Sequence, residues 1–166
     1  MTKRVLIVSN SFDLHADLVT PYLNDYHAEP FRIDLDCFPR DYQIVQLFWH
    51  GKLISCITHL PSGQSLNLDE VGAIWLRKPA DYAFISNDLA PQELAYAKLE
   101  TEHALFGLLY PLDCYWMSHP IQLRGAMWKA EQLHRATNSE QGRQFRTLIV
   151  LKVWQHSLIH LCFAAY

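Results

Sequence analysis

The chain has 166 residues, of which half are apolar and 13% aromatic, and its formal net charge is −3 at pH 7. This length and apolar content suffice for one domain with a substantial core, and they exclude an intrinsically disordered chain. The acidic balance argues against nucleic-acid binding through bulk positive charge. No apolar run approaches the ~20 residues of a membrane-spanning helix, and the run after the basic N-terminus is too short for a signal peptide. We therefore predict a cytoplasmic protein.

The four cysteines and nine histidines are scattered along the chain. They form no C-x-x-C and no H-E-x-x-H motif, which are the spacings typical of metal or redox sites. In a reducing compartment such cysteines are expected to be buried or half-buried apolar side chains. The sequence therefore predicts no metal site.

The N-terminal segment predicts a strand–helix–strand unit. The apolar run 5–8 is typical of a strand buried on both faces, and the alternating run 31–35 predicts a second strand. Asp13 is placed to cap the helix between them, and Pro21 is expected to bend or break that helix near Asp17. The apolar face expected of this helix consists of Leu14, Leu18, Val19, Tyr22, Leu23 and Tyr26.

The middle of the chain predicts a small antiparallel meander. Strand-like runs at 43–48 and 53–58 are separated by His50-Gly51, which suits a tight turn. A third alternating segment follows at 65–68, and the apolar run 71–76 returns to a buried strand.

Two further helices and two strands are predicted beyond this point. Pro91 fits the first turn of a helix that ends before Pro111, with Asn87 or Asp88 as its cap. The remaining expected elements are a strand at 115–117, a helix from 123 to about 137, and a strand at 146–151.

Together these elements predict an α/β fold. We expect a three-layer, Rossmann-like domain with a parallel sheet and an inserted antiparallel β-meander. The domain is assigned to residues 1–137, and residues 138–166 are treated as the start of a linker or second lobe with a divergent or truncated tail.

Asp13, His15 and Asp17 mark a candidate site where the first strand meets the first helix, because open α/β sheets bind ligands at the carboxyl ends of their strands. Two carboxylates oppose a phosphate there, and no glycine allows a pyrophosphate to approach the backbone. The structural alternative is a helix whose capping carboxylates complement its macrodipole. His15 has no nucleophile or metal set beside it, so no catalytic residue is assigned.

Arg77 and Lys78 follow the strand 71–76 and should therefore reach the same edge. They could clamp a carboxylate or phosphate of a ligand, or pair with Asp13, Asp17 or Asp81. The residue types leave both roles open.

Arg32 and Asp34 should share one face of the second strand, where cross-strand pairing is expected.

Several segments recur in an order and spacing that resemble a known family. They are Val5-Leu6-Ile7-Val8-Ser9-Asn10 with Asp13 and His15-Ala16-Asp17; Phe31-Arg32-Ile33-Asp34 with Phe38-Pro39; and Ala73-Ile74-Trp75-Leu76-Arg77-Lys78-Pro79, continued by Glu100, Gly107-Leu108-Leu109, Trp116, Pro120, Lys129 and Gln132-Leu133. This pattern resembles the N-terminal pre-ATP-grasp domain of MvdD-type ATP-grasp peptide maturases, the microviridin or graspetide ligases.

The resemblance implies a function. Such ligases use ATP and magnesium to activate acidic side chains of a ribosomal precursor peptide and close ω-ester or ω-amide rings. Their N-terminal domain supports substrate placement and subunit contacts. The implied partners are therefore the precursor peptide and a second copy or a full-length maturase.

The sequence also departs from that family. The maturases are about twice as long, the segment 151–166 matches nothing expected, and the residues that grip ATP have no counterpart here. We therefore expect a domain that is inactive alone, with ATP and magnesium bound by other lobes. A standalone peptide-binding or adaptor module is the alternative, and a flavodoxin-like regulatory domain is a third hypothesis. The apolar tail predicts self-association.

Overall fold

A computed structural model describes residues 3–78, 80–126, 128, 130, 131, 134, 147–153 and 159–165. The chain divides into two compact units, Met1–Pro120 and Ile121–Tyr166. The domain boundary predicted near residue 137 lies outside the described residues, so it stays a prediction.

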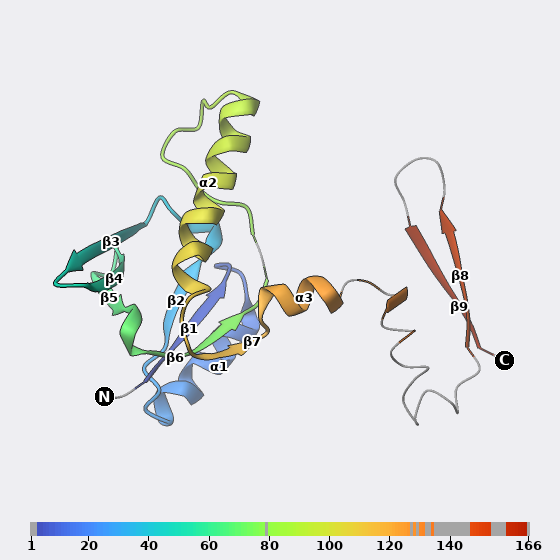
Figure 1. The fold of residues 1–166 in the computed structure, drawn as a ribbon, viewed down its shortest axis with the longest axis horizontal. Helices are drawn as coiled ribbons and strands as arrows, with labels where there is room; N and C mark the ends of the chain where they lie inside the picture. The colour runs from blue at the N-terminus through green and yellow to red at the C-terminus, as the bar shows by residue number, and fades with distance from the viewer. Residues whose placement is uncertain are drawn as a thin grey trace. The chain divides into compact units, whose positions relative to one another are not determined.

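The first unit is built on a four-stranded parallel sheet (Figure 1). Its strands are β1 (Arg4–Ser9), β2 (Phe31–Asp34), β6 (Val71–Leu76) and β7 (Tyr115–Met117), in the order β2-β1-β6-β7. The central strand β1 is buried on both faces, as its continuous apolar run predicted. All four predicted strands are confirmed.

One helix covers each face of this sheet. Leu6 and Val8 of β1 pack with Leu105 and Leu109 of α2 (Pro91–Leu109). Ile7 is also fully buried and, because side chains alternate along a strand, points to the opposite face, where α1 (Leu14–Asp25) contacts β1. The β1–β2 and β6–β7 crossovers leave the sheet centre in opposite directions, so equal handedness places their helices on opposite faces. The predicted three-layer α/β fold is confirmed.

The helix α1 buries a different face from the one predicted. Ala16 is fully buried, with Val19, Thr20 and Leu23 half-buried beside it. Apolar residues cover more than half of the circumference of this helix, and the sheet covers only the half centred on Ala16. Four of the six predicted members are therefore exposed, namely Leu14, Leu18, Tyr22 and Tyr26.

Pro21 does not break α1, which continues from Leu14 to Asp25. Proline removes the N–H that would bind the carbonyl oxygen of Asp17. Both residues are exposed, so water can satisfy that oxygen. The predicted break is therefore wrong, whereas the alternative, a bend near Asp17, stays a prediction.

The predicted meander forms a separate antiparallel sheet in the order β3-β4-β5. Its strands are β3 (Tyr42–Trp49), β4 (Lys52–His59) and β5 (Gln64–Asn67), flanked by the short 3₁₀ helices η1 (Leu35–Cys37) and η2 (Leu68–Glu70). The β3–β4 turn has positive φ at His50 and Gly51, 47° and 75°, as a two-residue hairpin requires. The turn predicted at these residues is confirmed.

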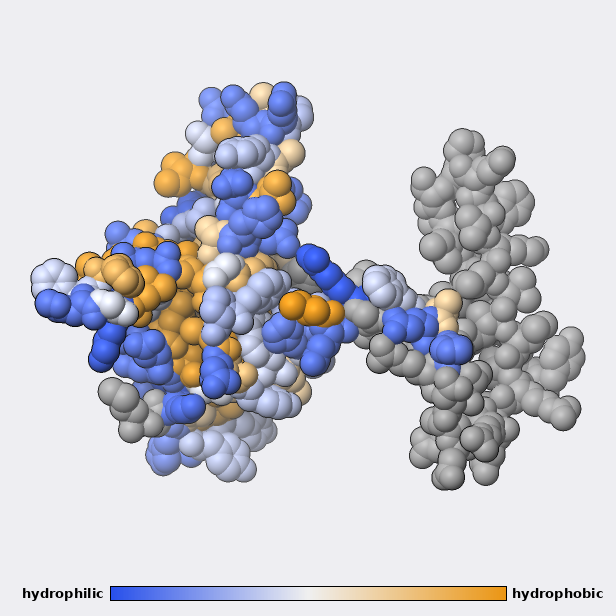
Figure 2. All heavy atoms as spheres, in the orientation of Figure 1, coloured by the Kyte–Doolittle hydropathy of each residue, from blue (hydrophilic) through white to orange (hydrophobic). Residues whose placement is uncertain are grey.

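The meander is buried at its base and solvent-exposed at its tip. Tyr42, Ile57 and Leu66 belong to the same core cluster as the sheet residues. The hairpin tip, defined here as residues 45–54, exposes six large apolar side chains: Val45, Leu47, Phe48, Trp49, Leu53 and Ile54. Figure 2 shows hydrophobic residues gathered over this part of the molecule.

The start of α2 differs from its prediction. The cap is Ala90 rather than Asn87 or Asp88, and the Glu93 carboxylate accepts a hydrogen bond from the Ala90 N–H at 2.9 Å. Glu93 therefore satisfies one of the free N–H groups of the helix start in place of a capping side chain.

In the second unit, α3 (Pro120–Ala126) begins at the boundary, and the rest of the helix predicted to residue 137 lies largely outside the described residues. The strands β8 (Thr147–Val153) and β9 (Ile159–Ala165) pair antiparallel. The strand predicted at 146–151 is confirmed, whereas β9 was not predicted. No helix among the described residues is long and apolar enough to cross a membrane.

Candidate functional site

The carboxyl ends of β1 and β6 bring the predicted site residues together. The Arg77 N–H donates to the Val8 carbonyl oxygen at 2.9 Å, which continues the β1–β6 pairing one residue beyond β6. The turn after β1 places Asp13 at the start of α1, where its side chain caps the helix by accepting from the His15 N–H at 3.3 Å. The capping role predicted for Asp13 is confirmed.

Asp13 and Arg77 form a bidentate ion pair. Nε of Arg77 lies 2.5 Å from Oδ2 of Asp13, and Nη2 lies 3.1 Å from Oδ1. The Asp13 side chain is fully buried, and the Ser9 hydroxyl also donates to Oδ2 at 2.6 Å. The guanidinium carbon of Arg77 lies 5.0 Å from the ring centroid of Trp75. The pair therefore ties the loop after β6 to the start of α1.

These contacts set the charge of the Asp13 carboxyl. Hydrogen bonding from Arg77 holds its pKa well below the ordinary value, with burial acting in the opposite direction and Ser9 adding to the lowering. Asp13 is therefore ionised over the whole physiological pH range. Of the two roles left open for Arg77, the structure shows the pairing.

Arg32 forms a second group of ionic contacts at the same edge. Its guanidinium contacts the carboxylates of Asp17 and Asp34, the latter at 2.6 Å, and the carbonyl oxygen of Asn10. Arg32 and Asp34 share a face of β2 as predicted, but the partners of Arg32 lie on its own strand, on α1 and in the turn before α1. The predicted cross-strand pairing is therefore wrong.

Sequence reasoning missed part of this polar network. Ser11 donates to the Asp36 carboxylate through its backbone N–H at 2.8 Å and through its hydroxyl. The Tyr42 hydroxyl accepts from the Asp34 N–H at 3.0 Å, which connects the edge to the meander. The available signal was the same spacing of polar residues at the end of each strand, Ser9 and Ser11 at the end of β1 and Asp34 and Asp36 at the end of β2.

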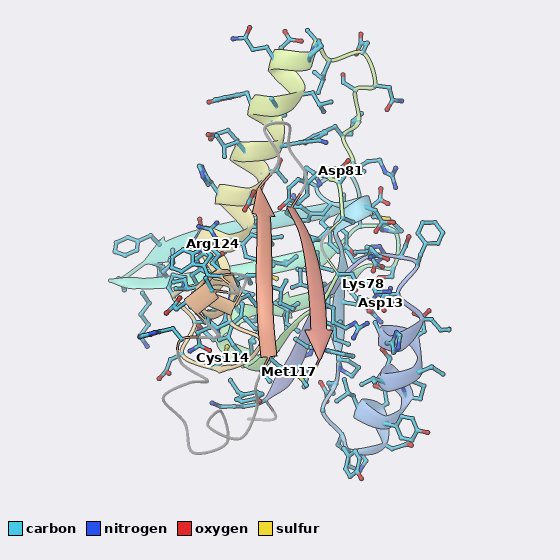
Figure 3. All side chains as sticks on the ribbon, turned by 90° about the vertical axis from the view of Figure 1, so that its right-hand side faces the viewer. Asp13, Lys78, Asp81, Cys114, Met117 and Arg124 are labelled. Atoms are coloured by element: carbon cyan, nitrogen blue, oxygen red, sulfur yellow. The ribbon has the colours of Figure 1, made fainter. Side chains whose placement is uncertain are left out.

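Two of the predicted site residues remain accessible beside the buried pair. The Lys78 side chain is 57% exposed, and its Nζ lies 3.9 Å from Oδ1 of Asp13; the two residues lie side by side in Figure 3. The His15 side chain is 68% exposed, with Nδ1 3.7 Å from the same oxygen. Asp81, the other predicted partner, pairs instead with Lys98 of α2 at 3.0 Å.

A polar surface hollow of about 430 Å³ adjoins the Arg32 contacts. It is lined by Asp17, Thr20, Asn24, Pro30, Arg32 and Gln64. Its walls come from α1, β5 and the segment around the start of β2, so it lies beside β2, the outermost strand of the sheet on this side.

The described edge lacks two features that are typical of a nucleoside triphosphate site. The N-terminus of α1 already has a carboxylate acceptor in Asp13, and the cation that faces it, Arg77, is used by that carboxylate. The turn from Ser9 to Asp13 contains no glycine to admit a phosphate. Within the described part of the chain, no group of three or more His, Cys, Asp or Glu side chains is arranged to hold a metal ion.

Comparison with known proteins agrees with this architecture. Residues 4–124 match the family described as the MvdD pre-ATP grasp domain. No curated protein matches the sequence.

Solved structures of two macrocyclases and one ATP-grasp ligase share the fold. The macrocyclase MdnC from Microcystis aeruginosa MRC, bound with precursor peptide MdnA, aligns over 90% of this chain and 47% of its own, with TM-score 0.74 and 24% identity. The macrocyclase MdnB from the same source aligns over 99% and 62%, with TM-score 0.72 and 21% identity. A RiPP-associated ATP-grasp ligase of Chryseobacterium gregarium, in complex with ADP and a leader and core peptide, aligns over 99% and 56%, with TM-score 0.73 and 20% identity.

These alignments show a common fold and a difference in length, because the chain spans between 47% and 62% of the length of the three aligned proteins. The match over residues 4–124 covers most of the chain and contains the whole polar edge. The chain belongs to the MvdD pre-ATP-grasp domain family.

Proposed function

We propose that this chain is the N-terminal domain of an ATP-grasp ligase that forms ω-ester or ω-amide crosslinks in a ribosomal precursor peptide. The observation that carries the proposal is the family match over residues 4–124. It is supported by the peptides bound in MdnC and in the Chryseobacterium gregarium ligase. A cytoplasmic location, where a ribosomal peptide is made, is part of the proposal.

The role assigned to this chain is to position the precursor peptide, and not to activate its acidic side chains. The turn between β1 and α1 contains no glycine-rich phosphate loop, so none of the residues at this edge is assigned a catalytic step. Nucleotide and metal belong to other lobes of a longer enzyme, and the chain alone is inactive.

Lys78 is the residue best placed to hold an acidic peptide. Its side chain is more than half exposed, and its ammonium nitrogen lies 3.9 Å from Asp13, which already accepts from Arg77, Ser9 and the His15 N–H. The Lys78 charge is therefore incompletely compensated and can pair with a carboxylate of the peptide. The polar hollow beside Arg32 offers further hydrogen-bonding groups along the same side.

Calorimetric titration of the 166-residue chain with the MdnA peptide tests this role. We expect saturable binding that weakens about 2- to 5-fold in Lys78→Ala, the loss typical of one exposed ion pair. Lys52→Ala, at the hairpin tip far along the chain from the edge, is the matched control and should bind like the wild type. Absence of binding, or equal losses in the two variants, would contradict peptide placement at this edge.

A second measurement tests the division of labour. The chain incubated with magnesium, ATP and MdnA should release no ADP, and the peptide should lose no water in its mass spectrum. Turnover by this chain alone would overturn the assignment of nucleotide chemistry to other lobes.

A standalone adaptor that pairs with a full-length maturase is the second candidate, and the exposed hairpin tip favours it. Size-exclusion chromatography of the chain mixed with MdnC distinguishes the two. Co-elution that is lost in Phe48→Glu would support the adaptor, whereas separate elution would support the domain role.

A further inference from the structure

The hairpin tip exposes apolar side chains in a part of the chain that has no carboxylates. Figure 1 shows the β3–β4 hairpin extending away from the parallel sheet. No Asp or Glu occurs from Tyr42 to Leu68, although the chain has 17 of them, and Lys52 is the only Lys or Arg in that range. The edge strand β3 has no charged residue, whereas exposed edge strands usually carry charges that prevent pairing with other chains. The tip therefore has the composition of a surface that something outside the first unit covers.

Both sides of the β3–β4 ribbon are apolar at the tip. Leu47 pairs with Ile54 across the strands, and Phe48 pairs with Leu53 at the next position. Because side chains alternate along a strand, these two pairs point to opposite sides of the ribbon. All four side chains are exposed, from 39% at Ile54 to 73% at Phe48. One flat protein surface would cover only one of the two sides, whereas a fluid apolar layer can surround the tip.

The last cross-strand pair before the turn combines an aromatic ring with a cation. Trp49 pairs with Lys52, and the Trp49 ring lies 4.9 Å from the ring of His50, centroid to centroid. Trp49 is 62% exposed. Tryptophan rings are enriched where membrane and water meet, and a lysine there lays its carbon chain along apolar groups while its ammonium group reaches the lipid phosphates. The end of the hairpin therefore has the residue types of a membrane–water interface.

We propose that the hairpin tip binds the surface of a membrane that contains anionic lipids. The hairpin enters obliquely and to a depth of about 5–10 Å, as surface-bound elements do. Phe48 and Leu53 then contact the acyl chains, and the side of the ribbon that carries Trp49 and Lys52 faces the lipid phosphates. This proposal does not depend on the proposed function.

The exposed area supports binding of this kind. If each full side chain offers roughly 150–250 Å², the exposed fractions of the six apolar side chains of the tip amount to on the order of 600 Å². Monomeric proteins rarely leave larger apolar patches in water. Because the strength of surface binding scales with the apolar area that is inserted, this patch is large enough to hold the chain on a bilayer.

The net charge of −3 does not oppose this contact, because the carboxylates of the meander lie far from the tip. Asp41 precedes β3 and is separated from Trp49 by about 27 Å of extended strand. Charges are screened beyond roughly 8–10 Å at physiological salt. Lys52 is therefore the charge of the meander that an anionic surface meets first.

The outward side of α1 is the rival apolar surface, and its charges fit an anionic membrane less well. Leu18 and Tyr22 are exposed there, 58% and 65%. The same helix also exposes the carboxylates of Asp17 and Asp25. A negatively charged lipid surface would repel these two groups. The α1 side therefore supplies a control for the hairpin tip.

Vesicle flotation of the full 166-residue chain tests the proposal, because it separates bound protein from aggregates, which sink. The vesicles are phosphatidylcholine in which about one third of the lipid is phosphatidylglycerol. The wild type should float with them. Phe48→Glu/Trp49→Glu should lower the partition coefficient at least ~10-fold, because two carboxylates replace inserted apolar groups. Its circular dichroism should match the wild type, since both residues are exposed.

Leu18→Glu/Tyr22→Glu is the matched control, because it adds the same two charges to exposed apolar positions of α1. It should float like the wild type. Lys52→Ala should weaken binding to the mixed vesicles about 5-fold and leave binding to pure phosphatidylcholine unchanged. Trp49→Phe should still float but lose most of the tryptophan quenching that brominated lipids cause in the wild type.

A wild type that does not float, equal losses in the two double variants, or quenching that persists in Trp49→Phe would each overturn membrane binding by the hairpin tip. Co-elution with MdnC that depends on Phe48, without flotation, would assign the tip to a protein partner and would overturn the proposal as well.

Discussion

The parallel sheet and the meander contain the same kinds of apolar residue and differ in what covers them. In the sheet, Leu6, Ile7 and Val8 are fully buried because a helix lies on each face. In the meander, Leu66 is fully buried at the base, whereas Leu53 is more than half exposed at the tip. An apolar strand residue therefore contributes to stability only where a tertiary partner reaches it, and the stability of this domain should be concentrated in the sheet and the meander base.

The largest effect is expected at the charged edge of the sheet. Asp13→Ala leaves the Arg77 guanidinium without its buried partner, and removing one member of such a pair costs about 3–5 kcal/mol of unfolding free energy. Urea unfolding at pH 7 measures the loss. Lys98→Ala, which removes the exposed ion pair with Asp81, is the control and should cost below ~1 kcal/mol. A similarly small loss of unfolding free energy in both variants would show that the Asp13–Arg77 pair does not stabilise the fold.

The same pair should make the sheet edge sensitive to acid. The pKa of Asp13 in the folded chain is held below its ordinary value of 3.8, chiefly by hydrogen bonding from Arg77. Because the pKa of Asp13 is lower in the folded chain than in the unfolded chain, its ionised carboxylate stabilises the fold fully when the pH lies above the unfolded-chain value. This stabilisation is lost as the pH falls from there through the folded-chain value. Asp13→Asn should therefore flatten the dependence of stability on pH below about 4. An unchanged acid slope would contradict this origin.

Two leucines of the meander test burial directly. Leu66→Ala should cost about 2–5 kcal/mol because it opens a cavity in the shared core. Leu53→Ala should stay within about 0.5 kcal/mol of the wild type because water already reaches the side chain. Thermal and urea unfolding give both values. Equal losses at the two positions would mean that the tip is buried in solution, as a contact with a partner would require.

The meander base should respond to alkali as the sheet edge responds to acid. Burial raises the pKa of Tyr42 to about 12, partly offset by the hydrogen bond from the Asp34 N–H. A raised folded pKa gives stabilisation that is present below the unfolded value of 10.0 and is lost between pH 10 and 12. Tyr42→Phe should remove up to about 3 kcal/mol of this alkaline loss. The exposed Tyr96→Phe is the control, and an identical alkaline profile in both variants would refute the effect.

The smallest effect is expected at a glycine of the hairpin turn. Gly51 has φ +75° and no atom within 4 Å of a built Cβ, so Gly51→Ala should cost about 1 kcal/mol through backbone strain alone. Gly107 of α2 also has open space around it but lies inside a helix, so Gly107→Ala should stabilise the chain by about 0.5–1 kcal/mol. Opposite signs in thermal unfolding confirm the difference, and two losses would contradict it.

Local sequence patterns predicted most of the architecture. The strand at 71–76 was found because an apolar run is typical of a strand covered on both faces. The His50-Gly51 turn was found because such a pair suits the tight turn between two antiparallel strands of a hairpin. The candidate edge was found because carboxyl ends of parallel strands meet at one side of a sheet. The cap of α2 was missed because Glu93 acts from inside the helix, so no capping residue type precedes Pro91.

The sequence by itself determined the order of the strands and helices up to β8, the family, and most of the charged residues at the sheet edge, since each depends on short-range patterns. Only the tertiary structure decided that Arg77 pairs with Asp13 and that Arg32 pairs with Asp17 and Asp34. It also decided that α1 buries Ala16 and leaves most of its large apolar side chains exposed. Burial and ion pairing depend on which distant segment packs against a residue, and the sequence pattern of one segment does not specify that partner.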